Sequence, residues 1–200
     1  RTGAFEMKLL MATNNSGKVR ELLELLDMPG VTAETLPEAG YKIEVVEDGT
    51  TFSENAFKKA METHRITGMT TVADDSGLCV KALSGAPGIY SARWAGEGAT
   101  GRDMVNKLLS EMRGVTDREA EFVSSVVMVF SEDDYIVAEG RCRGIIAEAP
   151  AGDGGFGYDP VFYVPECGKT FAELSLEEKN KISHRGKALR KMKEMLKKEL

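Results

Sequence analysis

The sequence has 200 residues, of which 42% are hydrophobic and 29% charged, and its formal net charge is −6. A negative charge spread along the chain argues against a general attraction to duplex nucleic acid, so we expect no nucleic-acid partner. The longest apolar run, residues 126–130, is far shorter than the roughly 20 residues of a membrane helix, so no membrane partner is expected.

The three cysteines, Cys79, Cys142 and Cys167, are far apart and lack the spacing of a zinc site or a disulfide framework. They favour a reducing compartment, and no apolar leader is recognisable, so a cytoplasmic location is expected. Residues 1–6, RTGAFE, resemble an expression scar. We therefore expect a single domain over residues 7–200.

In chain order, residues 8–13 predict a short strand, and a helix with the apolar spacing i, i+3, i+4, i+7 follows it. That stripe consists of Val19, Leu22, Leu23 and Leu26. A second helix is predicted between a capping box, formed by Thr51 and Glu54, and Gly68. Its expected core face consists of Phe52, Ala56, Phe57 and Ala60.

Residues 70–73 and 78–83 predict two strand segments that flank DDSG, and Thr100 caps a third helix. Residues 121–130 and 135–146 predict a hairpin, and a further capping box precedes a final helix that carries Leu189, Met192 and Leu196. The capping box is formed by Ser175 and Glu178. Helices interleaved with strands, together with a hairpin, indicate an α/β protein with a mixed sheet.

The stretch TNNSGKVRE, residues 13–21, places small polar residues and Lys18 at the start of a helix. Backbone N–H groups there can bind phosphate oxygens, with the lysine as a point charge. It is not a Walker A loop, because Ala12 and Val19 stand where that motif needs glycine and Ser or Thr. A plain helix cap by Asn15 or Ser16 explains the same residues, so phosphate binding is one of two interpretations.

The stretch VADDSGLCV, residues 72–80, sets two adjacent carboxylates at the end of an apolar strand. Adjacent residues of an extended chain face opposite sides, so one aspartate points into a site and the other supports it. Two such charges favour a hard divalent cation such as Mg²⁺. A polar Asp-Ser-Gly turn without function is the alternative.

The stretch PAGDGGFGYDP, residues 150–160, matches GxGxxG, but a strand-like VFYV follows where a dinucleotide-binding fold needs a helix. The glycines permit close backbone approach, and Phe156 and Tyr158 offer flat faces for a base. A purely structural loop is equally compatible with these residues.

In ISHRGKA, residues 182–188, His184 and Arg185 begin the last helix, and Lys179 lies one turn upstream. Surface charge is the alternative for Lys179 and Arg185, and a capping role for His184. His64 has no partner in sequence and is treated as structural. The basic residues from Arg185 onward fit a solvated helix face.

Six stretches together resemble the inosine triphosphatase or Ham1-like family of purine nucleoside triphosphate pyrophosphatases: TNNSGKVREL, GTTFSENAFKKA, ADDSGL, GAPGIYSARWAG, PAGDGGFGYDPVF and EEKNKISHRG. The resemblance implies a mixed, elongated central β-sheet flanked by helices, in two lobes with an active-site cleft between them, and a homodimer. It also implies Mg²⁺-dependent hydrolysis of ITP, dITP and XTP to the monophosphate and pyrophosphate.

By the same resemblance, Asp75 is the catalytic base, and Glu47 and Asp75, with Asp74 in support, hold the metal. The implied substrate-binding residues are Thr13, Asn14, Asn15, Ser16, Gly17, Lys18, Lys59, Ser76, Phe156, Gly157, Tyr158, Asp159, Lys179, His184 and Arg185. Donors from Arg185, His184 or the backbone are expected to pair with a 6-oxo purine and to reject adenine.

Two other functions are compatible with parts of the chain. VRELLEL shares features with a Nudix box, but Ala12 and Leu25 replace two glutamates that the box requires. The basic last helix and the glycine-aromatic loop would also suit a nucleic-acid binding module without catalysis.

Overall fold

The computed structural model describes residues 6–199, and within them the chain forms a seven-stranded mixed sheet in the order β2-β1-β3-β4-β5-β6-β7. The strands are β1 (Met7–Met11), β2 (Val31–Thr35), β3 (Thr71–Val80), β4 (Glu119–Ser131), β5 (Asp134–Ile146), β6 (Phe162–Val164) and β7 (Lys169–Thr170). β1 runs parallel to β2 and β3, and the other pairings are antiparallel. The predicted mixed sheet is confirmed. Of the expected scar, residues 1–6, all but Glu6 lie outside the described part.

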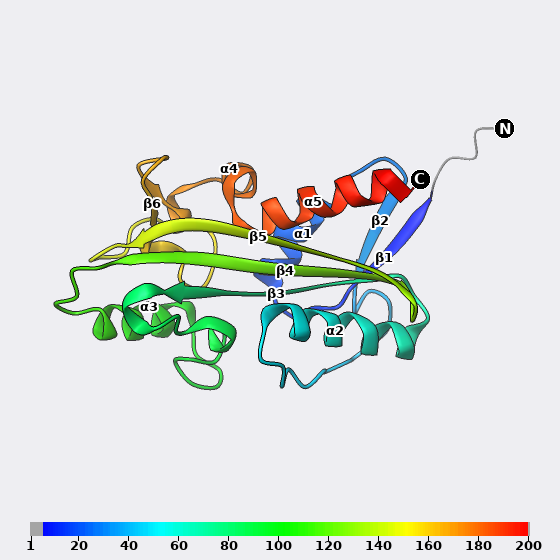
Figure 1. Ribbon diagram of the computed structural model, residues 1–200, viewed down its shortest axis with the longest axis horizontal. Coiled ribbons are helices and arrows are strands. Elements are labelled where there is room, and N and C mark those ends of the chain that lie inside the picture. The colour runs from blue at the N-terminus through cyan, green and yellow to red at the C-terminus, as the bar shows by residue number, and fades with distance from the viewer. Residues whose placement is uncertain (1–5, 200) are drawn as a thin grey trace.

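The α-helices are α1 (Ser16–Leu25), α2 (Phe52–Thr67), α3 (Gly101–Glu111), α4 (Leu176–Ile182) and α5 (His184–Glu199). Figure 1 shows α2 and α3 along one face of the long strands β3, β4 and β5, and α4 and α5 along the other. No helix within residues 6–199 is long and apolar enough to cross a membrane.

The apolar core is divided along the length of the sheet. One cluster packs α3 and β6 against one end of β3 and β4 through Leu78, Leu108 and Phe162. A second packs α1 and α5 against the other end through Leu22 and Leu189. The hydrophobic effect therefore builds two halves on one continuous sheet, and the polar middle of β3 lies between them.

β3 corrects the prediction of two strand segments interrupted at DDSG, because the strand is continuous and pairs with β4 along its whole length. Turn-forming residues are tolerated in this strand because contacts with distant parts of the chain hold them in the extended conformation. A Cβ at Gly77 would lie 2.5 Å from Ser91 Oγ and close to the carbonyl of Gly88, so the glycine lets a neighbouring loop approach the strand.

Helix α1 begins as predicted and buries most of the predicted stripe, because Leu22 and Leu26 are buried and Val19 packs against the same core. Its buried residues are Gly17, Glu21, Leu22 and Leu25, whereas Leu23 is 44% exposed. The i, i+3, i+4, i+7 spacing predicts Leu23 in the core, and at this one position of the stripe the prediction is wrong. The structure instead buries Glu21 as part of an ion-pair network.

The capping predictions are largely confirmed. Complete capping boxes stand at Thr100 and Ser175. At α2, Thr51 caps the helix, but the side chain of Glu54 accepts from Thr50 N at 2.7 Å instead of closing a box with Thr51. His64 is structural, as expected, because its Nδ1 lies 2.8 Å from the carbonyl of Met69.

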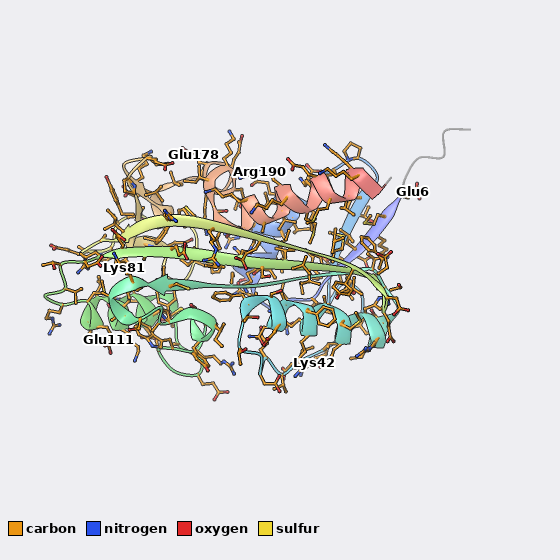
Figure 2. The ribbon with its side chains drawn as sticks, viewed as in Figure 1. Glu6, Lys42, Lys81, Glu111, Glu178 and Arg190 are labelled. Carbon is orange, nitrogen blue, oxygen red and sulfur yellow. The ribbon has the colours of Figure 1, made fainter. Side chains whose placement is uncertain are left out.

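Three basic residues of α5 donate to backbone carbonyls. Lys191 donates to Glu139 O at 2.7 Å, and Lys187 donates to Arg141 O at 3.0 Å. Arg190 of α5 lies beside α4 (Figure 2), where it donates to the carbonyls of Asn180 and Lys181 near the end of α4. These lysines and this arginine therefore tie α5 to β5 and α4.

Candidate active site

A cleft of about 770 Å³ lies between the two halves of the molecule and collects almost every candidate residue. The lining includes the following residues: Thr13, Asn14, Asn15, Ser16, Gly17, Lys18, Glu47, Lys59, Asp75, Ser76, Phe156, Gly157, Tyr158, Asp159, Lys179, His184 and Arg185. Asp74 alone among the candidates does not line it. Five segments far apart in sequence are thus brought to one cavity.

The loop before α1 is both a helix cap and an open N-terminus. Asn15 Oδ1 accepts from Lys18 N at 3.1 Å, and Thr13 Oγ1 accepts from Asn15 N at 3.1 Å. The cap occupies one N–H of the first turn, and the N–H groups of Ser16 and Gly17 have no carbonyl partner inside the helix. The two sequence interpretations are therefore compatible with one another.

The adjacent aspartates of β3 point to opposite faces of the sheet, as predicted. Asp74 is fully buried: its Oδ1 pairs with Lys18 Nζ at 3.0 Å and Arg185 Nη2 at 3.2 Å, and its Oδ2 accepts from Ser124. Burial favours the neutral acid, but Arg185, Lys18 and Ser124 outweigh it and hold the pKa of Asp74 well below its usual range.

This geometry indicates how Asp74 would play the supporting role that the sequence predicts. Both of its oxygens are already hydrogen-bonded, and its side chain lies on the other face of β3 from Asp75. Asp74 therefore supports the site by fixing Lys18 and Arg185, not as an oxygen donor to a metal beside Asp75.

Asp75 points into the cleft and is 6% exposed. Burial raises the pKa of its carboxyl from 3.8 to about 6, against the opposing effect of Lys18 and Lys59. Lys59 Nζ lies 4.0 Å from Asp75 Oδ1 and 2.8 Å from Glu47 Oε1, so two carboxylates converge on one ammonium group.

Lys179 and Arg185 are buried, which excludes the alternative of ordinary surface charge. Lys179 Nζ pairs with Asp159 Oδ2 at 2.6 Å and with Glu21 Oε2 at 3.0 Å, and Glu21 Oε1 accepts from Arg185 Nη1 at 2.7 Å. Burial disfavours the Arg185 cation, but Asp74 and Glu21 outweigh it and raise its pKa. We call Glu21, Asp74, Asp159, Lys18, Lys179 and Arg185 the buried ion network.

Glu21 is the residue of this network that the sequence interpretation missed. It stands three positions after Lys18 and next to Leu22, on the buried face of α1. A glutamate inside an apolar helical stripe is rarely buried without a partner. That position was the available signal for a buried cation elsewhere in the chain.

The glycine-aromatic loop uses its two rings differently from the prediction. Tyr158 is buried, its hydroxyl donates to Ser91 O at 2.7 Å, and burial raises its pKa, so it anchors the loop and offers no free face for stacking. Phe156 lies in the cleft with Lys179 Nζ 4.8 Å from its ring centre.

His184 is buried beneath the cleft. Its ring stacks on Phe122 at 4.7 Å with an interplanar angle of 13°. Burial, with Arg185 and Lys179, holds its pKa well below its usual range, so the imidazole is neutral. Its Nδ1 has no hydrogen-bond partner among the described residues. Ser183 Oγ accepts from Gly186 N at 3.0 Å and caps the start of α5, so the alternative of a capping role for His184 is not needed. His184, predicted to bind substrate, lines the cleft with a neutral ring.

Gly17 is needed for close approach of Phe156. A Cβ added to Gly17 would lie 2.5 Å from Phe156 Cγ and 2.8 Å from Cε1. Alanine favours a helix over glycine by about 1 kcal/mol, so Gly17→Ala should not reduce stability through backbone effects. We expect it to displace the Phe156 ring and to lower kcat/KM by about 10- to 100-fold, mainly through KM.

The test is a double-mutant cycle with Phe156→Leu, measured by steady-state kinetics and thermal unfolding. If the ring transmits the effect, Gly17→Ala changes kcat/KM little in the Phe156→Leu background. Equal effects of Gly17→Ala in both backgrounds would contradict the role assigned to the contact.

Residues 9–195 match the Ham1 family. A dITP/XTP pyrophosphatase of Desulforamulus reducens is 51% identical over 192 residues, which span 95% of this chain and 96% of that protein. One of Thermus thermophilus is 50% identical over 193 residues, 96% and 92% of the two chains.

Solved structures agree with the sequence comparisons. The Ham1 protein of Staphylococcus aureus superposes with a TM-score of 0.86 at 40% identity, covering 96% of this chain and all 100% of that one. A HAM1 protein of Coxiella burnetii gives a TM-score of 0.87 at 38% identity, covering 96% and 99%. The chain belongs to the Ham1 family.

Proposed function

We propose that this protein is a nucleoside triphosphate pyrophosphatase that hydrolyses the unusual purine nucleotides ITP, dITP and XTP to the monophosphate and pyrophosphate. The observation that carries the proposal is the meeting, in one cleft, of a capped helix N-terminus bearing Lys18 and a buried carboxylate with a raised pKa, Asp75. The first suits a triphosphate and the second suits a general base. The relatives named dITP/XTP pyrophosphatase support the substrate class.

The residues fit a hard divalent cation, for which we propose Mg²⁺. Glu47 and Asp75 offer carboxylate oxygens around Lys59, whose Nζ lies 2.8 Å from Glu47 Oε1 and 4.0 Å from Asp75 Oδ1. No cluster of three or more His, Cys, Asp or Glu side chains within residues 6–199 could enclose a metal. Two carboxylates completed by phosphate oxygens and water are a usual Mg²⁺ arrangement. Bound there, the cation would neutralise charge on the phosphate oxygens.

The reaction is an in-line displacement at the α-phosphorus. Asp75 accepts a proton from a water molecule, whose oxygen forms the new bond to the α-phosphorus. The bond to the bridging oxygen breaks, and its electron pair leaves with pyrophosphate. A base with a pKa of about 6 is ionised at neutral pH yet basic enough to assist. Lys18 and Lys59 stabilise the charge that develops on the phosphate oxygens.

Base selection requires donors that face a 6-oxo group. Arg185 binds Glu21, Asp74 and Ser76 through its terminal nitrogens, whereas its Nε has no partner among residues 6–199. Nε–H of Arg185 and the neutral ring of His184 are therefore the available groups. Adenine presents a donor at that position, and a buried mismatch costs about 1 to 3 kcal/mol per group.

The test measures pyrophosphate release from dITP, ITP, XTP, GTP and ATP, each with and without Mg²⁺. We expect kcat/KM for the first three to exceed that for ATP by at least about 10-fold, and activity to depend on the cation. Equal rates for all five nucleotides would refute the base selection. No pyrophosphate release, together with salt-dependent RNA binding, would favour the alternative of a nucleic-acid binding module.

We also propose a cytoplasmic homodimer of a single domain that binds neither nucleic acid nor membranes. The dimer is supported by the family resemblance alone. The location is supported by the three free cysteines, Cys79, Cys142 and Cys167. Sedimentation of the full chain tests the dimer, for which a monomer at micromolar concentration would be the contrary result.

A further inference from the structure

One row of side chains crosses three strands beside the catalytic carboxylate. In the register of the sheet, Asp75 of β3 stands opposite Ser125 of β4, and Ser125 stands opposite Glu139 of β5. Directly opposed residues of antiparallel strands share a face, with their Cβ atoms about 5 Å apart. The carboxylate of Asp75 and the hydroxyl of Ser125 are therefore neighbours on the face that α2 covers.

Both side chains carry an unsatisfied atom. Ser125 is fully buried and Asp75 nearly so, and neither Ser125 Oγ nor Asp75 Oδ2 has a hydrogen-bond partner among residues 6–199. Glu139, opposite Ser125 on β5, is turned toward Arg141, which binds its Oε1 at 2.8 and 3.0 Å, and it makes no hydrogen bond to Ser125 Oγ. Buried polar atoms are normally paired, so two unpaired atoms at opposed positions need an explanation.

The preceding serine shows what such a hydroxyl does in this strand. Ser124 faces the other side of the sheet, is fully buried, and donates to Oδ2 of Asp74. The consecutive serines of β4 thus face the consecutive aspartates of β3, one pair on each side. On the Asp74 side the hydrogen bond is made, and on the Asp75 side the donor and acceptor are in place.

We propose that Ser125 is a positioning residue for Asp75, whose Oδ2 accepts a hydrogen bond from the Ser125 hydroxyl in the working enzyme. A rotation about one side-chain torsion moves the hydroxyl between its staggered positions. With Oδ2 held, Oδ1 is fixed toward Lys59 and the cleft. Ser125 does not contact the substrate, so its effect is on catalysis and not on nucleotide binding. The inference rests on the proposed function for its kinetic part.

The test compares Ser125→Thr with Ser125→Val, which have the same shape and differ only in the hydroxyl, and adds Ser125→Ala. We expect Ser125→Ala and Ser125→Val to lower kcat for dITP by about 10-fold, with KM changed less than about 2-fold. The kcat of Ser125→Thr should exceed that of Ser125→Val by the same factor. Val127→Ala, a truncation on the same face of β4, controls for lost packing and should lower Tm without this kcat pattern.

A second readout does not depend on turnover. The affinity for Mg²⁺ alone, obtained from the rise in Tm with its concentration, should be about 10-fold weaker in the Val variant than in the Thr variant. If the unmodified enzyme releases no pyrophosphate, the proposed function fails and this comparison still decides the role of Ser125. The inference is overturned if Ser125→Thr and Ser125→Val have equal Mg²⁺ affinity and, where there is turnover, equal kcat.

Discussion

Asp75→Asn is expected to reduce kcat/KM by about 10²- to 10⁴-fold, because the change removes the base and one carboxylate oxygen of the cation site together. Asparagine keeps the size of the side chain, so the cleft should retain its shape. Nucleotide binding through Lys18 and Lys179 should persist, and the loss should appear mainly in kcat. The measurement is steady-state pyrophosphate release with Mg²⁺. A variant with near-normal turnover would contradict the assignment.

The same substitution is expected to stabilise the metal-free protein at alkaline pH. Burial raises the Asp75 pKa from 3.8 to about 6, so between these pH values the folded protein binds more protons than the unfolded chain. Stability therefore falls as pH rises through this window, and above it the full penalty is present. At 1.36 kcal/mol per pKa unit, burial of the ionised Asp75 lowers the free energy of unfolding by about 3 kcal/mol. Asp75→Asn has no charge to bury and avoids this cost.

Thermal unfolding in chelator at pH 8 and at pH 4 checks this prediction. We expect the Asn variant to have the higher Tm at pH 8, by roughly 5 to 10 °C, and the difference to shrink toward pH 4. Asp133→Asn, at an exposed turn position, is the matched control and should change Tm little. An Asp75→Asn Tm at or below that of the unmodified protein at pH 8 would show that this burial cost is absent.

Local patterns predicted the helices and the long hairpin well. The helix caps at Asn15, Thr100 and Ser175 and the hairpin of β4 and β5 involve residues close in sequence, which is why spacing alone identifies them. β2 was not predicted. It is a short edge strand of mostly half-exposed residues, and only its pairing with β1 makes it a strand.

The site was predictable as a set of residues but not as a network. Motif spacing and resemblance identified all the cleft residues named above, yet which aspartate faces which cation depends on contacts between positions more than 100 residues apart. The pair of Glu21 with Arg185 and the pair of Asp74 with Arg185 are of this kind. Local propensity also misread DDSG as a turn, because Arg185 and the loop near Gly88 hold these residues in a strand.

The buried ion network makes a second large prediction, which concerns Glu21. The network balances three cations, Lys18, Lys179 and Arg185, against three carboxylates, Glu21, Asp74 and Asp159. Removing one partner of a buried pair leaves an uncompensated charge and costs about 3 to 5 kcal/mol. Glu21→Gln keeps the shape and removes only the charge. We expect its Tm to fall by roughly 6 to 20 °C.

A charge-restoring second substitution distinguishes this cause from lost packing. In Glu21→Gln with Lys18→Met, two cations again face two carboxylates, because Asp159 keeps Lys179 and Asp74 keeps Arg185. The double variant should therefore be more stable than Glu21→Gln alone, although it loses a cleft lysine. Glu24→Gln, exposed on the same helix, is the matched control and should change stability by less than about 0.5 kcal/mol. Additive losses in the double variant would mean that Glu21 and Lys18 act independently, and the charge balance of the buried ion network would then not determine its stability.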